Sequence, residues 1–319
     1  MSVIVEKPFL SIKKQIAKLK SQGLNIRKDN HTYNLLLTHS YYAFVNGYCD
    51  LLIKSRSPRV FKDGAKFSEL EAIHDFDTGF RRFLFPQILY IEAKIKANCI
   101  YSFCGKKDSG NYLYPADKYL DISSYDTLNA IKLRSANKLI DDFNSAISTN
   151  LHKRNGCFIH ANSNYGYIPF WILATDLSFG QVSRFYECIR YDIRSIIAQS
   201  YNLDEKDLKT VLKILSNIRN ACAHNNRVYI SYIPEILSNH IGLGSSSIDV
   251  DHKCDHKFGS ILYALKFLLS AKKFKKITDE LGKELSRLKT SLSTIKIQDV
   301  LLKMGISSKM ISDFCIKIE

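Results

Sequence analysis

An arginine and an asparagine followed by a histidine form the stretch of this sequence that is best suited to chemistry. Arg219 and Asn220 precede His224, and Arg227 follows closely. Cleavage of an RNA strand requires activation of the 2′-hydroxyl, stabilisation of the phosphorane charge and protonation of the departing 5′-oxygen. A histidine transfers protons near neutral pH, and a guanidinium binds two phosphate oxygens at once. The stretch therefore favours RNA cleavage, with His224 transferring protons and Arg219 stabilising charge.

The neighbouring polar residues have supporting roles in this hypothesis. Asn220 could orient the imidazole or donate to phosphate, and Arg227 could extend the phosphate contact. One imidazole cannot readily perform both proton transfers from opposite sides, so a second copy across a two-fold interface would supply the missing group, and the mechanism predicts a homodimer. The alternative is that Arg219 caps helix carbonyls and His224 is an ordinary polar residue at a helix end.

A predicted amphipathic helix leads into the stretch. Its apolar residues recur at helical spacing, and they are Leu208, Val211, Leu212, Leu215, Ile218 and Cys222. The arginine and histidine are thus expected at a helix C-terminal end. At 100° per residue, Asn220, His224 and Arg227 would share the polar side of the helix, with Arg219 at the edge of the apolar stripe.

Composition points to a polyanionic partner. The chain has 46 Lys and Arg against 31 Asp and Glu, a net charge of +15, and such an excess is typical of nucleic-acid binding. The lysines of a C-terminal tract are either a solvated helix face or a phosphate-binding surface; they are Lys272, Lys273, Lys275 and Lys276. The start of the sequence lacks the apolar core of a signal peptide, and no uncharged run is long enough to span a bilayer, so we expect a cytoplasmic protein without membrane contact. The eight cysteines are scattered, so we expect them to be reduced.

Apolar periodicity predicts helices nearly throughout, and hence an all-α fold. The longest predicted helix covers about 67–103, with a kink at Pro86 and an ion pair between Asp77 and Arg81. We expect a loop over 106–117 and irregular structure over 150–167. The other expected helices, shown by their apolar spacing, cover about 12–22, 125–149, 169–178, 181–198 and 208–224.

Two further clusters of residues are candidate sites. Arg154 and His160 repeat the order of arginine and histidine, and they are either a chance match or a contributing element. His252, Cys254 and His256 resemble metal ligands but lack a second half with zinc-site spacing, so a solvated linker is favoured and neither a metal ion nor a cofactor is predicted.

The sequence also resembles a known family along its whole length. The matching segments include the Arg219–His224 stretch with Arg227 and, near the C-terminal end of the sequence, Met304-Gly305-Ile306. The others are Lys7-Pro8 followed by Gln15, Leu19 and Gly23-Leu24, then Tyr41-Tyr42, Asn46-Gly47-Tyr48, Phe76-Asp77 with Arg81, Ile91-Glu92, Pro169-Phe170-Trp171 and Leu177-Ser178-Phe179-Gly180. In these segments the chain resembles abortive-infection proteins of the AbiD/AbiF type in the HEPN superfamily.

The resemblance implies a HEPN-like helical bundle with additional N- and C-terminal helices. The glycine- and serine-rich segment that starts at Gly242 predicts a flexible linker over 242–257, which separates a helical domain over 1–241 from a basic helical extension over 258–319. The resemblance also implies a metal-independent endoribonuclease that leaves 2′,3′-cyclic phosphate ends and acts as a phage-defence effector or toxin. In some members of the family, a neighbouring RNA or protein acts as the antitoxin. Arg219, His224 and Asn220 would be its catalytic residues. The alternatives are a non-catalytic RNA-binding module of the same fold and a helical protein-interaction scaffold.

Overall fold

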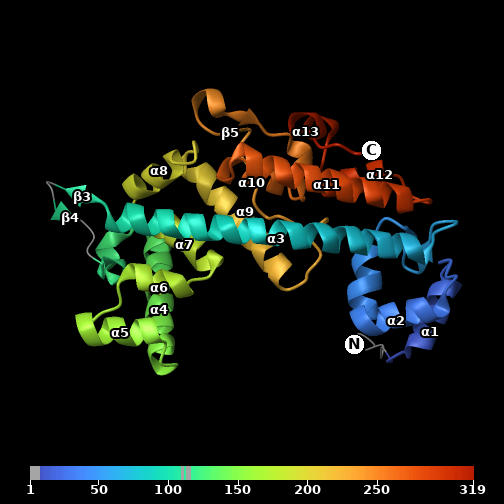
Figure 1. Cartoon of the computed structure of the whole chain (residues 1–319), viewed down its shortest axis with the longest axis horizontal. Helices are drawn as coiled ribbons and strands as arrows, with labels where there is room; N and C mark the ends of the chain where they lie inside the picture. Colours follow the sequence, from blue (N-terminus) through green and yellow to red (C-terminus); the bar gives the residue numbers. More distant parts are fainter. Residues whose placement is uncertain (1–7, 109–110, 113–115) are drawn as a thin grey trace. The chain divides into compact units, whose positions relative to one another are not determined.

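The computed structural model describes residues 8–108, 111–112 and 116–319, and this part of the chain is predominantly helical (Figure 1). The all-α fold class is thereby confirmed. The described residues also form three two-stranded antiparallel sheets, each of short strands. Lys7, which contributes to the family resemblance, and part of the loop expected over 106–117 lie outside the described residues.

The chain divides into two compact units, each assembled from separate stretches of sequence. Unit 1 comprises the described part of Met1–Phe83 together with Arg227–Ile230 and Lys275–Glu319. Unit 2 comprises Leu84–Asn226 and Ser231–Phe274. Each unit therefore needs residues that are distant in sequence to complete its core.

Unit 1 begins with a short amphipathic helix, as predicted. Its apolar spacing buries Ile16 and Leu19, and the chain turns away at Gly23, whose φ of +92° favours glycine. The elements of unit 1, with two helices that continue into unit 2, are α1 (Ile12–Ser21), α2 (Asp29–His39), the π-helical turn Tyr42–Asn46, β1 (Ile53–Arg56), β2 (Arg59–Phe61), the start of α3 (Phe67–Cys104), most of α11 (Ala271–Ser291), α12 (Ile297–Met304) and α13 (Ser308–Asp313).

The long helix α3 confirms the predicted stripe. Every apolar residue of the stripe is buried: Leu70, Ile73, Phe76, Phe80, Leu84, Ile88, Ile91 and Ile95. The predicted ion pair is also present, with Arg81 donating to the Asp77 carboxylate at 2.9 Å. Pro86 lies inside the helix.

Unit 2 is a helical bundle with an aromatic core. Phe170 lies 4.7 Å from Phe185 and 5.6 Å from Phe103 between ring centroids, and all three side chains are buried. Besides the remainder of α3 and the start of α11, its elements are β3 (Lys107–Asp108), β4 (Asn111–Tyr112), the 3-10 turns Lys118–Leu120 and Ile122–Ser124, α4 (Ala130–His152), α5 (Gly156–Tyr165), α6 (Phe170–Asp176), α7 (Phe179–Cys188), α8 (Tyr191–Gln199), α9 (Glu205–Ala223), β5 (His240–Ile241), the 3-10 turns Gly244–Ser246 and His252–Cys254, β6 (Ile248–Asp249) and α10 (Gly259–Leu268).

Two expectations about unit 2 were wrong. The segment 150–167, expected to be irregular, contains α5, because the Asn155 side chain accepts the Cys157 amide at its start and Phe158 is buried in the core. The single helix expected over 181–198 is two helices, because the chain is extended at Ile189 between α7 and α8.

The segment predicted as a linker, 242–257, contains short regular elements and one fully buried side chain. Its strand β6 pairs with β5 through Ile248 and Ile241, and Cys254 has no exposed surface. The division of the chain into domains at 241 and 257 stays a prediction.

Candidate active site

Helix α9 carries the arginine and the histidine, and its local sequence explains where it begins. The Asp204 carboxylate accepts hydrogen bonds from the backbone amides of Lys206 at 2.9 Å and Asp207 at 2.7 Å, which satisfies two free donors of the first turn. Every residue of the predicted apolar stripe, from Leu208 to Cys222, is buried. The helix therefore packs by this stripe and presents its opposite side outward.

The end of α9 is a Schellman motif, which fixes the backbone around His224. Asn225 adopts the left-handed conformation with φ +53° and donates to the Cys222 carbonyl at 3.3 Å, while the amide of Asn226 donates to the Ala221 carbonyl at 2.8 Å. His224 is the C-cap residue, and its amide still donates to the Asn220 carbonyl at 3.0 Å. The prediction that the stretch ends a helix is thus confirmed.

Arg219 is held by a buried carboxylate. Its Nε–H donates to Glu92 Oε2 at 3.1 Å, and Glu92, on α3 within unit 2, is only 7% exposed. Lys96, one turn further along α3, lies 3.6 Å from the same carboxylate. A carboxylate on Nε fixes the plane of the guanidinium while leaving its terminal nitrogens to face a phosphate.

The polar side of the α9 end is accessible. Asn220 and His224 are both exposed and lie one helical turn apart. An Arg219 terminal nitrogen is 3.5 Å from Asn220 Oδ1. Arg219, Asn220 and His224 are therefore presented together by the last turns of one helix in unit 2. The Arg219 guanidinium bonds to the side chains of Glu92 and Asn220 rather than to helix carbonyls of the described residues.

Arg227 does not share this helix face, so that expectation was wrong. Asn225 turns the chain out of the helix, and Arg227 belongs to unit 1, where its guanidinium donates to the Gly47 carbonyl and lies 3.5 Å from the Asp50 carboxylate. A role for Arg227 in RNA binding stays a prediction.

Asp77 anchors the residues that follow Arg227, and sequence reasoning missed this role. Its Oδ1 accepts the backbone amides of Val228 at 3.0 Å and Tyr229 at 2.7 Å, and its Oδ2 accepts the Tyr48 hydroxyl at 2.8 Å as well as Arg81. Burial raises the pKa of the Asp77 carboxyl, although these donors oppose the shift. Only the ion pair with Arg81 left a signal in the sequence, because the other contacts join residues far apart.

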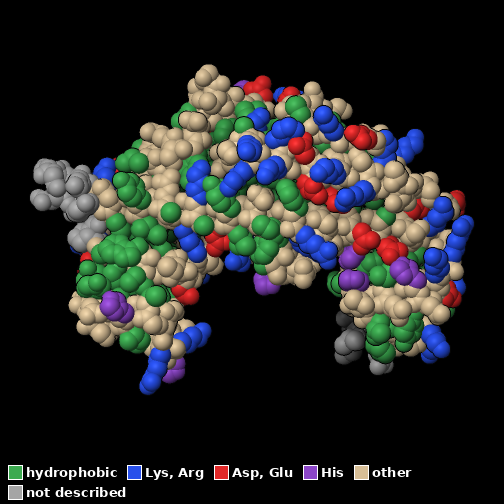
Figure 2. Space-filling view, viewed as in Figure 1, with side chains coloured by type: hydrophobic (Ala, Val, Ile, Leu, Met, Phe, Trp, Pro, Cys, Tyr) green, Lys and Arg blue, Asp and Glu red, His purple; other side chains and the backbone are tan. Residues whose placement is uncertain are grey.

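The predicted lysine tract lies at the start of α11. Lys272 and Lys276 are exposed, the Lys273 ammonium lies 2.9 Å from the centroid of the Tyr90 ring, and Lys275 pairs with Asp279 at 2.8 Å. Figure 2 shows Lys and Arg side chains gathered over α11 with acidic side chains among them. RNA binding by these lysines stays a prediction.

The second arginine and histidine are separated by a helix start. Arg154 has a φ of +54° in the turn that follows α4, and His160 is exposed on α5 beside Asn164, at 3.1 Å. Whether the two contribute to catalysis stays an open prediction.

The cluster around residue 252 is occupied by contacts within the protein. His252 pairs with Asp255 at 2.9 Å. His256 donates from Nδ1 to the Ile233 carbonyl at 2.8 Å, and its ring stacks on Tyr232. Among the described residues, no three His, Cys, Asp or Glu side chains are grouped so that they could hold a metal ion.

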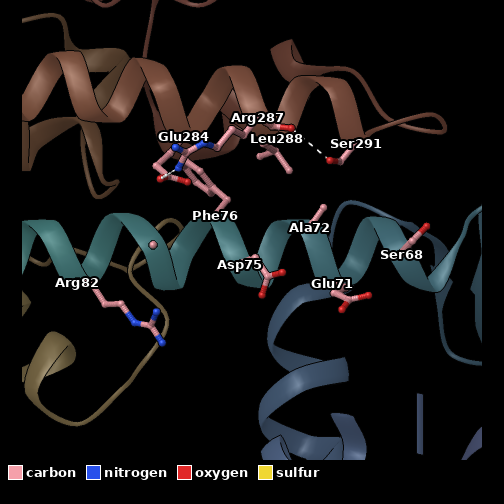
Figure 3. A pocket seen from close by; sticks show the side chains of 11 residues that line it. Ser68, Glu71, Ala72, Asp75, Phe76, Arg82, Glu284, Arg287, Leu288 and Ser291 are labelled. Atoms are coloured by element: carbon pink, nitrogen blue, oxygen red, sulfur yellow. Dashed lines mark hydrogen bonds and ion pairs between the residues drawn. The ribbon is translucent and has the colours of Figure 1, made fainter. Parts of the chain in front are cut away.

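Unit 1 contains a large open cavity of about 800 Å³ along α3 and α11. Figure 3 shows Glu71, Asp75 and Arg82 on the α3 side and Glu284 and Arg287 on the α11 side. Glu284 pairs with Arg287 at 2.5 Å, and burial raises the pKa of Glu284. The residues that line this cavity include no histidine, so it offers no equivalent of the proton-transfer group on α9.

Comparisons with known proteins give one result. Searches of the curated proteins and of the solved structures returned no significant match. In the described part of the chain, no helix is both long enough and apolar enough to cross a membrane. The family model described as "Abi-like protein" matches residues 34–230, which is more than half of the chain and includes the whole of α9. The chain belongs to the Abi-like protein family.

Proposed function

We propose that this protein is a metal-independent endoribonuclease of the HEPN superfamily, of AbiD/AbiF type, that acts as an abortive-infection effector or toxin in the cytoplasm. The family match indicates the abortive-infection role. The observation that supports the chemistry is the arrangement of Arg219, Asn220 and His224 on one helix end, with Glu92 holding the guanidinium at 3.1 Å.

In the proposed reaction, Arg219 stabilises the charge that develops on the non-bridging phosphate oxygens, because its terminal nitrogens form a planar fork. His224 transfers a proton to or from the reacting oxygens. The 2′-oxygen attacks the adjacent phosphorus, the bond to the 5′-oxygen breaks, and the departing oxygen receives a proton. The products are a 2′,3′-cyclic phosphate and a free 5′-hydroxyl.

The proton balance supports a homodimer. The attacking and departing oxygens lie on opposite sides of the phosphorane, and a single imidazole does not reach both. A second α9 end across a two-fold axis would supply another His224, one acting as base and the other as acid. An antitoxin, either RNA or protein, would restrain the activity by covering these helix ends.

The test compares wild-type protein with Arg219→Ala, His224→Ala and the conservative Arg219→Lys on total and structured RNA in excess EDTA. Cleavage by wild type that leaves 2′,3′-cyclic phosphate ends, and that falls sharply in all three variants, is the expected result. Undiminished cleavage by His224→Ala would contradict the proposal.

A non-catalytic RNA-binding module is the second candidate, favoured by the net charge of +15. It predicts that the wild type binds RNA without changing it, and that the affinity falls steeply as salt is added. Binding that is insensitive to salt would instead favour a protein-interaction scaffold. The same protein preparations distinguish these outcomes by gel analysis of the RNA and by titration at several salt concentrations.

A further inference from the structure

An open pocket of about 460 Å³ lies in unit 1, among elements that the proposed chemistry does not use. We call it the N-terminal pocket. It is bounded by the residues that lead into α1, by one side of α1, by the π-helical turn and by the tip of the β1–β2 hairpin. π-Helical turns are rare and recur at functional sites.

Two buried acceptors, one on α1 and one at its C-cap, have no donor among the described residues. Gln15 donates from Nε2 to the Leu10 carbonyl at 2.8 Å, while its Oε1 is buried and unpaired. Gln22 Oε1 is buried and unpaired in the same way. Both residues line the N-terminal pocket. Because an unpaired buried acceptor costs free energy, each amide would gain by turning its oxygen toward the pocket and accepting from a ligand that brings N–H donors.

The hairpin tip brings positive charges together. Arg56 and Arg59 are direct cross-strand partners, and like charges placed opposite each other destabilise a sheet. Arg56 is compensated by Asp50 at 3.0 Å. Arg59 donates to two neutral groups, the Tyr41 hydroxyl at 3.2 Å and Asn46 Oδ1 at 2.7 Å.

These contacts fix the Arg59 guanidinium without neutralising it. Lys18 also lines the pocket and is exposed. The described residues that line the pocket include no carboxylate. The pocket therefore favours an anion, and a phosphate suits a fixed guanidinium beside a lysine.

Two aromatic rings stand at the same pocket. Tyr42 is 76% exposed and Phe9 is 92% exposed, although each is large and apolar enough to gain by being covered. Planar bases stack on such exposed rings. Stacking rings, amide acceptors and a fixed cation are the three groups that recognise a nucleotide.

We propose that the N-terminal pocket binds one unpaired nucleotide of an RNA strand. The base stacks on Tyr42 and Phe9, and the attached phosphate lies against Arg59 and Lys18. The amino group of the base donates to Gln15 or Gln22 once that amide has turned its oxygen toward the pocket. The inference rests on the proposed RNA substrate and adds a binding site for it in unit 1. A free mononucleotide carries the same chemistry, and the test separates the two sources.

The experiment measures the affinity of the full chain for a fluorescein-labelled oligoadenylate of about eight nucleotides by fluorescence anisotropy. All proteins carry His224→Ala, so that the probe is not cleaved. Tyr42→Ala is expected to weaken binding about 5- to 150-fold, the effect of losing one stacked base. Lys18→Ala should weaken it and reduce its dependence on salt.

Matched controls are Tyr101→Ala, an equally exposed tyrosine in unit 2, and Lys13→Ala on the other side of α1. Both should bind as the parent protein does. Equal affinities for Tyr42→Ala and Tyr101→Ala, or no binding of the probe by the parent protein, would overturn the inference.

Adenosine monophosphate provides the second arm. If it does not displace the oligoadenylate, the RNA strand is the ligand, as proposed. If it displaces the probe in a manner that depends on Tyr42, the pocket serves a free nucleotide instead, and the strand assignment is overturned. Cleavage by protein with His224 restored is scored separately, so that failure of the pocket and failure of the ribonuclease proposal give different results.

Discussion

The substitution Glu92→Gln tests whether the buried carboxylate positions Arg219. It keeps the shape of the side chain and removes the charge that accepts the Arg219 Nε–H at 3.1 Å. A hydrogen bond between charged groups contributes about 1.5–3 kcal/mol to folding. Because the Arg219 side chain is 27% exposed, solvent screening lowers the expected loss to about 1–2 kcal/mol. A guanidinium displaced by about 1 Å should also lower kcat/KM by about 10- to 100-fold.

The stability part of this prediction has a convenient probe. Trp171 is the single tryptophan of the chain and lies on α6 in unit 2, together with Glu92 and Arg219, so urea unfolding followed by its fluorescence reports on the relevant unit. A double-mutant cycle with Arg219→Gln should give a coupling free energy of about 1 kcal/mol. Lys96→Gln is the control, since Lys96 is 3.6 Å from the carboxylate and should cost less than about 0.5 kcal/mol. Coupling below about 0.3 kcal/mol together with unchanged cleavage would refute the positioning role.

Three other predictions follow from the structure. Asn225→Ala should lower the free energy of unfolding by about 1 kcal/mol, because asparagine tolerates the left-handed backbone through local hydrogen bonds of its side chain and alanine does not. Asn225→Gly should not lower it, since glycine adopts this conformation freely, and Trp171 fluorescence measures both. Burial opposes ionisation of Glu69, but the amides of Ser293 and Thr294 outweigh it and lower its pKa below the ordinary 4.5. Glu69 thus stabilises unit 1 above pH 4.5 and loses this effect as the pH falls through its folded-state pKa, so Glu69→Gln should flatten the acid side of the stability profile followed by circular dichroism. Light scattering should give a mass of twice 36.5 kDa if the protein is the proposed homodimer, and a mass of 36.5 kDa would contradict it.

Periodicity predicted the elements whose stability depends on one apolar face. The α3 and α9 stripes are buried as expected, and the Asp77–Arg81 pair was predictable because its members are one helical turn apart. The site stretch on α9 could also be placed at a helix end, because the apolar stripe stops at Cys222.

The features that sequence reasoning missed depend on side-chain contacts that apolar spacing does not reveal. The break between α7 and α8 is stabilised by Arg194, whose buried guanidinium donates to the carbonyls of Glu187 at 3.1 Å and Ile189 at 2.8 Å. The contact between Glu92 and Arg219 joins residues on α3 and α9, and a single sequence gives no signal for such a pairing. The α5 helix was missed because its glycine and asparagines suggest a loop, whereas burial of Phe158 overrides that tendency.

The sequence order of the two units has a consequence for synthesis on the ribosome. Glu69 near the start of α3 is bound by Ser293 and Thr294, so unit 1 cannot complete its contacts until these two residues have been made. All residues of unit 2, including the catalytic candidates, emerge before the last segment of unit 1. Since compact units generally fold as they emerge, the nascent protein would present a folded α9 end while unit 1, which contains Tyr42, is still incomplete. A chain that stops before Lys275 would then keep Arg219 and His224 but lack the last segment of unit 1, the unit that contains the N-terminal pocket.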